Sequence, residues 1–272
     1  MKNKKFIAAL VITIIMFLVF DFGVVPRLVY TLAPSLMENA FADKIIIAIV
    51  RYSLAIFGYI MLTKFCGLDF SFKKKSNLRR IIGTVIMFIL LAIVNMFIKA
   101  PSEFERTFIQ ALPTVLFMFI YEMGTGFFEE MLMRGGLFNA FRFKFGESKK
   151  GIVKAIICSS ILFGLWHMGN LLWQPVVATI SQVFYSAMIG CVFAAIYYIT
   201  DNLWVGIMIH GIFDFTAFVW ECFATPAAED ISIMTGVLVV LLQLPVLIAA
   251  VVELNREFDR RGVDKKTEKL CA

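Results

Sequence analysis

Long apolar runs, separated by short hydrophilic stretches, occupy most of this 272-residue chain. A helix needs about 20 apolar residues to cross a hydrocarbon core about 30 Å thick. Since lipid offers the backbone no hydrogen-bond partners, such segments cross as helices. We predict an all-α polytopic membrane protein, one transmembrane domain over residues 1–272, with about eight spans at Phe6–Val25, Ile45–Cys66, Ile81–Ile98, Pro113–Phe141, Ile152–Leu172, Val176–Ile199, Leu203–Cys222 and Ile231–Val252.

The net charge of +6 comes from lysine and arginine residues whose positions indicate how the chain is oriented in the membrane. Lysine and arginine are concentrated on the cytoplasmic side of membrane proteins. Here they gather at the N-terminus, in alternate connections and in the tail, so we exclude nucleic acid as a partner and predict a cell-membrane protein with both termini cytoplasmic. The connection Leu172–Val176 and the pair Glu229-Asp230 are then expected outside. The basic residues are Lys2, Lys4, Lys5, Lys64, Lys73, Lys74, Lys75, Arg79, Arg80, Arg142, Lys144, Lys149, Lys150, Lys154, Arg256, Arg260, Arg261, Lys265, Lys266 and Lys269.

The first apolar run has an alternative interpretation as a signal peptide, with Ala40-Phe41-Ala42 as the cleavage site. The run ends some fifteen residues before that site, and its removal would break the charge alternation. We therefore favour a first span. The five cysteines form no Cys-x-x-Cys pair, which argues against a disulfide framework or a thiolate metal site.

Ionisable side chains inside the spans are costly in lipid and are therefore functional candidates. With Arg51 set aside, they fall on the fourth, fifth and seventh spans. Residues four apart share a helix face, which groups Glu130 with Arg134. One of the adjacent glutamates can thus pair with the arginine while the other stays free, although a plain interfacial salt bridge is an equal alternative. The candidates are Glu122, Glu129, Glu130, Arg134, His167, His210 and Asp214.

Both histidines of the chain, His167 and His210, lie within apolar runs. A lone histidine in a helix bundle is more often a packing residue, but two of them beside a Glu-Glu pair favour chemistry. Histidine serves as a general base or as a metal ligand, and two histidines with one glutamate form the ligand set of many catalytic zinc sites. We predict a possible divalent metal, such as zinc, held by Glu129, His167 and His210.

Helix rise offers a test of whether these groups meet. At 1.5 Å per residue, Glu129 and His167 each lie roughly 20 Å from the expected cytoplasmic boundary, whereas His210 lies roughly 10 Å from it. Tilted helices or a water-filled cavity would reconcile the difference.

Three motifs give the chain a family resemblance. Glu129-Glu130-Met-Leu-Met-Arg134 fits Glu-Glu-x-x-x-Arg, Phe163-Gly-Leu-Trp-His167 fits Phe-x-x-x-His, and His210-Gly-Ile-Phe-Asp214 fits His-x-x-x-Asx. In this order, within residues 123–215, they resemble the CPBP family, also called Abi, of type II CAAX prenyl endopeptidases and bacteriocin-processing or immunity-related membrane proteins.

The resemblance implies an eight-helix intramembrane endopeptidase, often described as a metalloprotease, whose membrane-embedded site faces the cytoplasm. Glu129 and His167 would activate the attacking water, and Glu130 and Arg134 would support them. His210 and Asp214 would stabilise the oxyanion or hold a ligand. The family has Asn where this chain has Asp214, and a carboxylate cannot donate a hydrogen bond unless it is protonated.

The implied partners are membrane lipid and a peptide or protein substrate that reaches the site from the membrane or the cytoplasm. Two other functions stay open. One is a non-catalytic membrane adaptor or bacteriocin-immunity protein on the same fold, because fold does not fix function. The other is a proton-coupled transporter, although the chain shows no inverted repeat of the kind common in transporters.

Overall fold

The computed structural model describes residues 2–21, 31, 40–68, 72, 77–172, 174–225 and 232–263. Within these ranges the chain is helical and has no strand. The α-helices are α1 (Lys2–Asp21), α4 (Ala40–Lys64), α5 (Ile82–Ile98), α6 (Phe108–Glu130), α7 (Asn139–Phe145), α8 (Lys149–Trp166), α9 (Val176–Thr200), α10 (Leu203–Phe218), α11 (Ile233–Leu241) and α12 (Leu244–Arg261). Four short segments join them: η1 (Leu78–Ile81), η3 (His167–Leu172) and η4 (Val219–Cys222) are 3₁₀-helices, and η2 (Met131–Phe138) is a π-helix.

The predicted polytopic α-helical fold is confirmed. In the described part of the chain, seven helical stretches are long and apolar enough to cross a membrane. The apolar α1, with 20 residues, adds an eighth long helix. This is a multi-pass membrane protein.

The fourth and the last of the predicted spans are longer and less regular in the structure than predicted. The fourth runs without interruption from Phe108 to Phe145 through α6, η2 and α7. The last is broken at residues 242–243, where α11 ends and α12 begins with Pro245 in its first turn. Proline lacks an N–H and is tolerated at a helix start, so the break falls where it costs least. The predicted outer pair Glu229-Asp230 lies outside the described residues.

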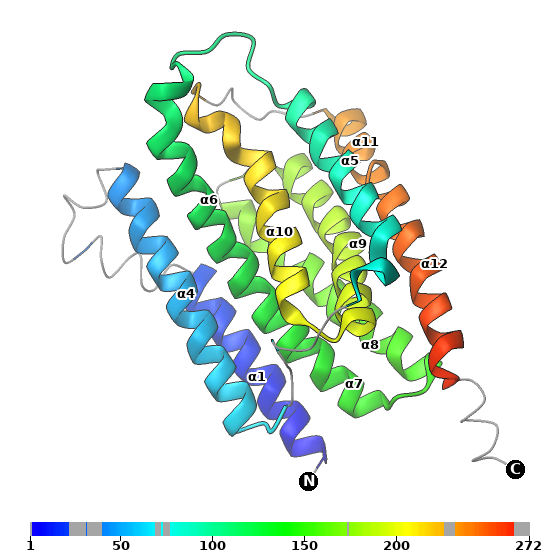
Figure 1. Ribbon diagram of the computed structural model, residues 1–272. Coiled ribbons are helices and arrows are strands. Elements are labelled where there is room, and N and C mark those ends of the chain that lie inside the picture. The colour runs from blue at the N-terminus through cyan, green and yellow to red at the C-terminus, as the bar shows by residue number, and fades with distance from the viewer. Residues whose placement is uncertain are drawn as a thin grey trace, which may run out of the picture.

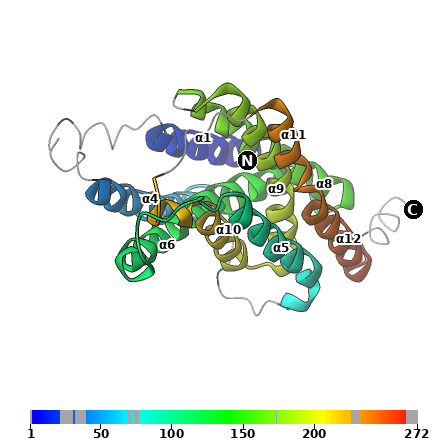
Figure 2. The ribbon, with the colours of Figure 1, turned by 90° about the horizontal axis from the view of Figure 1, so that it is seen from above.

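The helices form one bundle with α9 in its interior (Figures 1 and 2). Helix α9 packs against α8, α10, α11 and α12, and η2 packs against α1, α4, α8 and α9. The start of α1 and the end of α12 lie at the same end of the bundle (Figure 1). An even number of crossings requires this arrangement.

Side-chain caps set the starts of the helices that carry the site. Thr107 and Gln110 form a reciprocal capping box at the start of α6. Ser148 caps α8 and Asn202 caps α10, each accepting a bond from a backbone N–H. Such caps satisfy N–H groups that lack a partner within the helix. Between α9 and α10, Asp201 adopts a left-handed conformation with φ of 52°, which makes the turn tight.

Two buried glutamates of α12 anchor it to the rest of the bundle. Glu253 accepts bonds from the backbone N–H of Gly83 at 2.7 Å and from the hydroxyl of Thr84 at 2.5 Å, and so caps α5 from another helix. Glu257 lies within 3.3 Å of Arg80 and 2.7 Å of Arg261. Both carboxylates thus join α12 to η1 and the start of α5.

Candidate active site

Glycines let α6 and α10 approach closely enough to form the site. A Cβ added to Gly126 would lie 2.7 Å from the backbone N of Gly211 and 2.9 Å from the carbonyl of Ile207. A Cβ on Gly206 would lie 3.0 Å from Oε2 of Glu130. The two helices therefore touch backbone to backbone, which places the Glu-Glu pair of α6 beside His210 of α10.

Glu130 is the buried centre of the cluster. Its Oε1 lies 2.8 Å from Nη1 of Arg134 and 2.9 Å from Nδ1 of His210, and its side chain is 0% exposed. The guanidinium of Arg134 also donates to the carbonyl of Gly190 at 3.2 Å and lies over the rings of Phe163 and Phe193 at 4.8 and 5.1 Å. Aromatic faces stabilise a desolvated cation, so Arg134 is paired on several sides.

The helix that carries Arg134 changes its winding directly after the Glu-Glu pair. Residues Met131–Phe138 form the π-helix η2, and all eight of them are buried. Local π-helical turns occur frequently at functional sites. No sequence pattern signalled this change, because the motif fits an ordinary α-helical turn equally well.

His210 faces carboxylates with both ring nitrogens. Nδ1 contacts Glu130, while Nε2 lies 3.4 Å from Oδ2 of Asp214 and 3.6 Å from Oε2 of Glu129. The ring stacks on Phe193 with the centroids 4.7 Å apart. An imidazolium could donate in both directions at once, whereas a neutral ring can donate in only one. Glu130 is therefore the residue that orients Nδ1, and Asp214 faces the other nitrogen.

His167 lies at the C-terminal cap of α8, where η3 begins. Its Nδ1 lies 2.9 Å from the carbonyl of Phe163, which makes Nδ1 the donor and leaves Nε2 as the acceptor of a neutral ring. The ring packs edge-on against Phe163, which also contacts His210. Phe163 of the second motif thus positions both histidines.

The predicted difference in depth between Glu129 and His210 does not separate them, since their side chains are 3.6 Å apart. The estimate placed Arg142, Ile152 and Leu203 at one level along the membrane normal. Because the side chains of Glu129 and His210 meet, Leu203 lies deeper along the bundle than Arg142.

The structure can be compared with the predicted metal ligands Glu129, His167 and His210. Among the described residues, no three His, Cys, Asp or Glu side chains are grouped so as to hold a metal ion. Nδ1 of each histidine already has a partner, which leaves one nitrogen per ring. The described side chains therefore do not form a ligand set.

A second polar group adjoins the site and was only partly visible in the sequence. Arg51 of α4 donates to the hydroxyl of Thr125 at 2.6 Å, and Thr125 lies 2.9 Å from Oε2 of the buried Glu122. Glu122 was a sequence candidate because it is charged within a span. Thr125 carried no such signal, and the sequence did not link Arg51 to α6.

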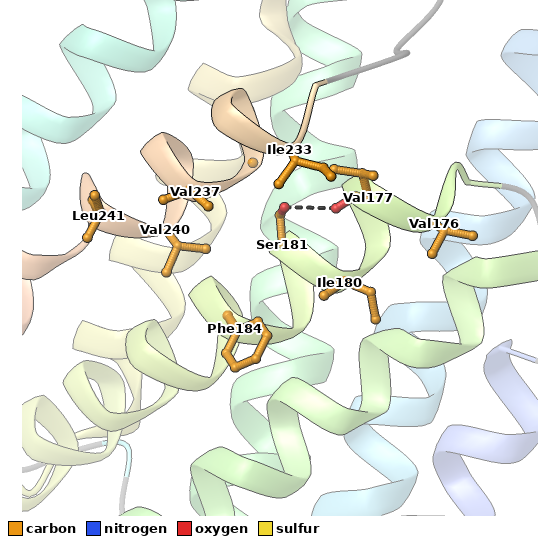
Figure 3. A pocket seen from close by; sticks show the side chains of 10 residues that line it. Val176, Val177, Ile180, Ser181, Phe184, Ile233, Val237, Val240 and Leu241 are labelled. Carbon is orange, nitrogen blue, oxygen red and sulfur yellow. Dashed lines mark hydrogen bonds between the residues drawn. The ribbon is translucent and has the colours of Figure 1, made fainter.

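An apolar pocket lies between α9 and α11 (Figure 3). It has a volume of about 350 Å³ and contains none of the predicted site residues. Its one hydroxyl, of Ser181, bonds to the carbonyl of Val177 at 2.8 Å. A pocket without free polar groups has no means to catalyse hydrolysis.

Comparison with protein families identifies the middle of the chain. Residues 110–216 match the family of type II CAAX prenyl endopeptidase Rce1-like proteins. This segment is similar to an Rce1-like domain. It contains all three motifs and every side chain of the cluster, which agrees with the resemblance seen in the sequence. Searches of curated proteins and of solved structures gave no match.

Proposed function

We propose that this protein is an intramembrane endopeptidase in which Glu129 activates water for attack on a peptide bond. The observation that best supports this proposal is that the side chains of Glu129, His167 and His210 come from three helices and lie at one site. Glu129 is the carboxylate left without the arginine, since Arg134 pairs with Glu130. A general base needs a free acceptor within reach of its water, and Glu129 retains 17% side-chain exposure.

The remaining residues have distinct roles in this mechanism. Nε2 of His167 is the free acceptor of its ring, and it orients the water together with Glu129. The water loses a proton to Glu129 as its oxygen bonds to the carbonyl carbon. The C–N bond then breaks, and that proton passes to the leaving amine. His210, held by Glu130, stabilises the tetrahedral oxyanion when it is protonated, which is the kind of fixed electrostatic support that accelerates acyl transfer.

Orientation in the membrane is part of the proposal. The start of α1 and the end of α12 lie at one end of the bundle (Figure 1). Basic side chains lie here by contact, since Lys144 lies over the ring of Phe6 in α1, and Arg80 and Arg261 pair with Glu257 near the end of α12. By the positive-inside rule this end is cytoplasmic, in the cell membrane.

The decisive test is cleavage of a peptide library by purified protein in detergent or nanodiscs. Glu129→Gln keeps the shape of the side chain but cannot accept the proton, so we expect at least a roughly 100-fold loss of cleavage. Thermal unfolding should change little. The matched control is Glu130→Gln, which frees Arg134 and His210 and should lower stability as well as activity.

A variant Glu129→Gln that keeps most of its activity would refute the assignment of the base. Parallel reactions with a chelator, and with added zinc, test the metal prediction independently of the base. A folded wild-type protein that cleaves nothing in either condition would favour the non-catalytic adaptor or immunity protein.

A further inference from the structure

His167 lies at the end of its helix, and its hydrogen bond there is to that same helix. Nδ1 donates to the carbonyl of Phe163, four residues earlier in α8. This bond orients the imidazole ring on α8. Contacts with other helices are needed to fix where the end of α8 lies in the site. Since α8 ends at Trp166 and η3 begins at His167, the contacts of η3 bear directly on the position of the ring.

The face of η3 that is turned toward the bundle carries two polar side chains. In a 3₁₀-helix, residues three apart are eclipsed, so His167 and Asn170 project from the same face. Burial agrees with this geometry, because both residues are half-buried, whereas Met168 and Leu171 are exposed. Asn170 therefore lies one turn beyond His167 on the inward face of η3.

Asn170 joins this inward face to α9. Its Nδ2 donates to Oε1 of Gln182 at 2.8 Å. Its backbone carbonyl accepts a bond at 2.7 Å from the N–H of Gln174, in the connection that leads to α9. Side-chain amides of Asn and Gln hydrogen-bond across helices in membrane proteins, where few other polar partners exist. The side-chain pair therefore links η3 to a neighbouring helix.

His167 lies between two contacts with α9. Before it, a Cβ added to Gly164 would lie 2.5 Å from the carbonyl oxygen of Val183, so α8 and α9 touch backbone to backbone there. After it, Asn170 bonds to Gln182. Each contact is three residues from the histidine, one on either side. The first is made by an α-helix and the second by η3, so the amide pair holds the segment on the far side of the ring.

Helix α9 also holds other groups of the cluster. Arg134 donates to the carbonyl of Gly190, and the ring of His210 stacks on Phe193 with the centroids 4.7 Å apart. A bond from η3 to α9 thus ties the end of α8 to the same helix that contacts the guanidinium and the other histidine. The relative position of the two histidines depends on this shared helix.

We infer that Asn170, held by Gln182, is a positioning residue for the reaction: it fixes His167 against α9 and so keeps Nε2 of His167 in place beside Glu129. Its effect on cleavage rests on the proposed function, whereas its effect on the His167 ring does not. The motif that carries His167 ends at that residue, and neither amide was among the candidates from the sequence.

A double-mutant cycle tests the effect on cleavage. Asn170→Leu and Gln182→Met each remove one amide at similar side-chain size. A displacement of about 1 Å in a reacting group can cost about 100-fold in rate. We expect each variant to lower kcat by about 10- to 100-fold with KM nearly unchanged, and the double variant to lose no more than the more affected single one, since both remove the same bond. Leu171→Ala, which truncates an exposed side chain of the same short helix, should be close to wild type.

Losses that multiply in the double variant would overturn the inference, and so would a rise in KM with kcat unchanged, because the amides would then act separately or bind substrate. Unchanged kinetics in both single variants would overturn it as well. Thermal unfolding checks that each variant is folded, and Gln182→Met supplies the same test should Asn170→Leu not fold.

Nuclear magnetic resonance of the imidazole rings tests the positioning without reference to activity. The chain has only two histidines, so isotope-labelled histidine gives two sets of ring signals, and His167→Gln assigns them. We expect Asn170→Leu and Gln182→Met to shift the ring signals of His167 and to leave those of His210 in place. Unshifted His167 signals, or equal shifts of both rings, would overturn the positioning role.

The two measurements separate this inference from the proposed function. If the wild-type protein cleaves no peptide but the His167 signals shift as expected, the positioning of the ring stands and the endopeptidase is rejected. If the wild-type protein cleaves peptides and the signals do not shift, the endopeptidase stands and the positioning role of Asn170 is rejected.

Discussion

At the scale of single residues, the carboxylate of Glu130 has two partners of which the sequence indicated one. The spacing of four residues predicted its pair with Arg134, because such residues share a helix face. Its contact with His210 crosses 80 positions of sequence. No periodicity reports on such a contact, and only the order of the three motifs hinted that these spans meet.

Asp214 is a second residue whose contacts could be predicted only in part from the sequence. Its spacing from His210 predicted a contact, and the two side chains are 3.4 Å apart. Which ring nitrogen would be involved could not be predicted, because that depends on Glu130 occupying Nδ1. Asp214 therefore shares Nε2 with Glu129. We expect its role to be to fix the ring rather than to donate to an oxyanion.

Replacement of Asp214 by asparagine tests this positioning role. The amide of the new side chain could donate to an oxyanion but would not carry the charge that holds His210, so we expect Asp214→Asn to reduce cleavage by about 10- to 100-fold. The rate should be measured from pH 5 to pH 9, since a change in the shape of the profile reports on the ring. Asp201→Asn, at the far end of α10, is the matched control and should be close to wild type. Full activity of Asp214→Asn at neutral pH would rule out the positioning role.

At the scale of secondary-structure elements, apolar run length predicted the helices well but not their irregularities. Hydropathy does not distinguish the π-helix η2 from α-helix, nor did it show the break between α11 and α12, because both are decided by packing and by single residues. Gly126 is such a residue: the sequence shows a glycine within a span, but not that α10 lies against it.

The substitution Gly126→Ala should separate α6 from α10. Its Cβ would meet backbone atoms of Gly211 and Ile207, which cannot rotate away as a side chain can. We expect a loss of about 1–3 kcal/mol in stability, as for other overpacked cores, together with reduced cleavage. Gly58→Ala is the control, since its Cβ would meet only the side-chain ends of Leu132 and Met16. Thermal unfolding in detergent compares the two, and equal stability would contradict the close contact of α6 and α10.

At the scale of the whole molecule, the alternation of basic connections predicted that the two ends of the chain lie together. The structure agrees, since α1 begins and α12 ends at one end of the bundle (Figure 1). Which segments bury one another across the bundle could not be predicted, because a charge pattern along the sequence contains no information about that.

Fusion reporters test the orientation of the whole molecule. With both termini cytoplasmic, green fluorescent protein joined to either end should fluoresce, and alkaline phosphatase joined to the C-terminus should be inactive, because the phosphatase folds only where disulfides form. Truncated fusions after Leu172 and after Asn202 supply a matched pair on the two sides of α9. The first should give phosphatase activity and the second should not, since positive charge favours the cytoplasmic side and the last rich connection precedes α8. Active phosphatase at the C-terminus would mean that the chain crosses the membrane an odd number of times or lies inverted.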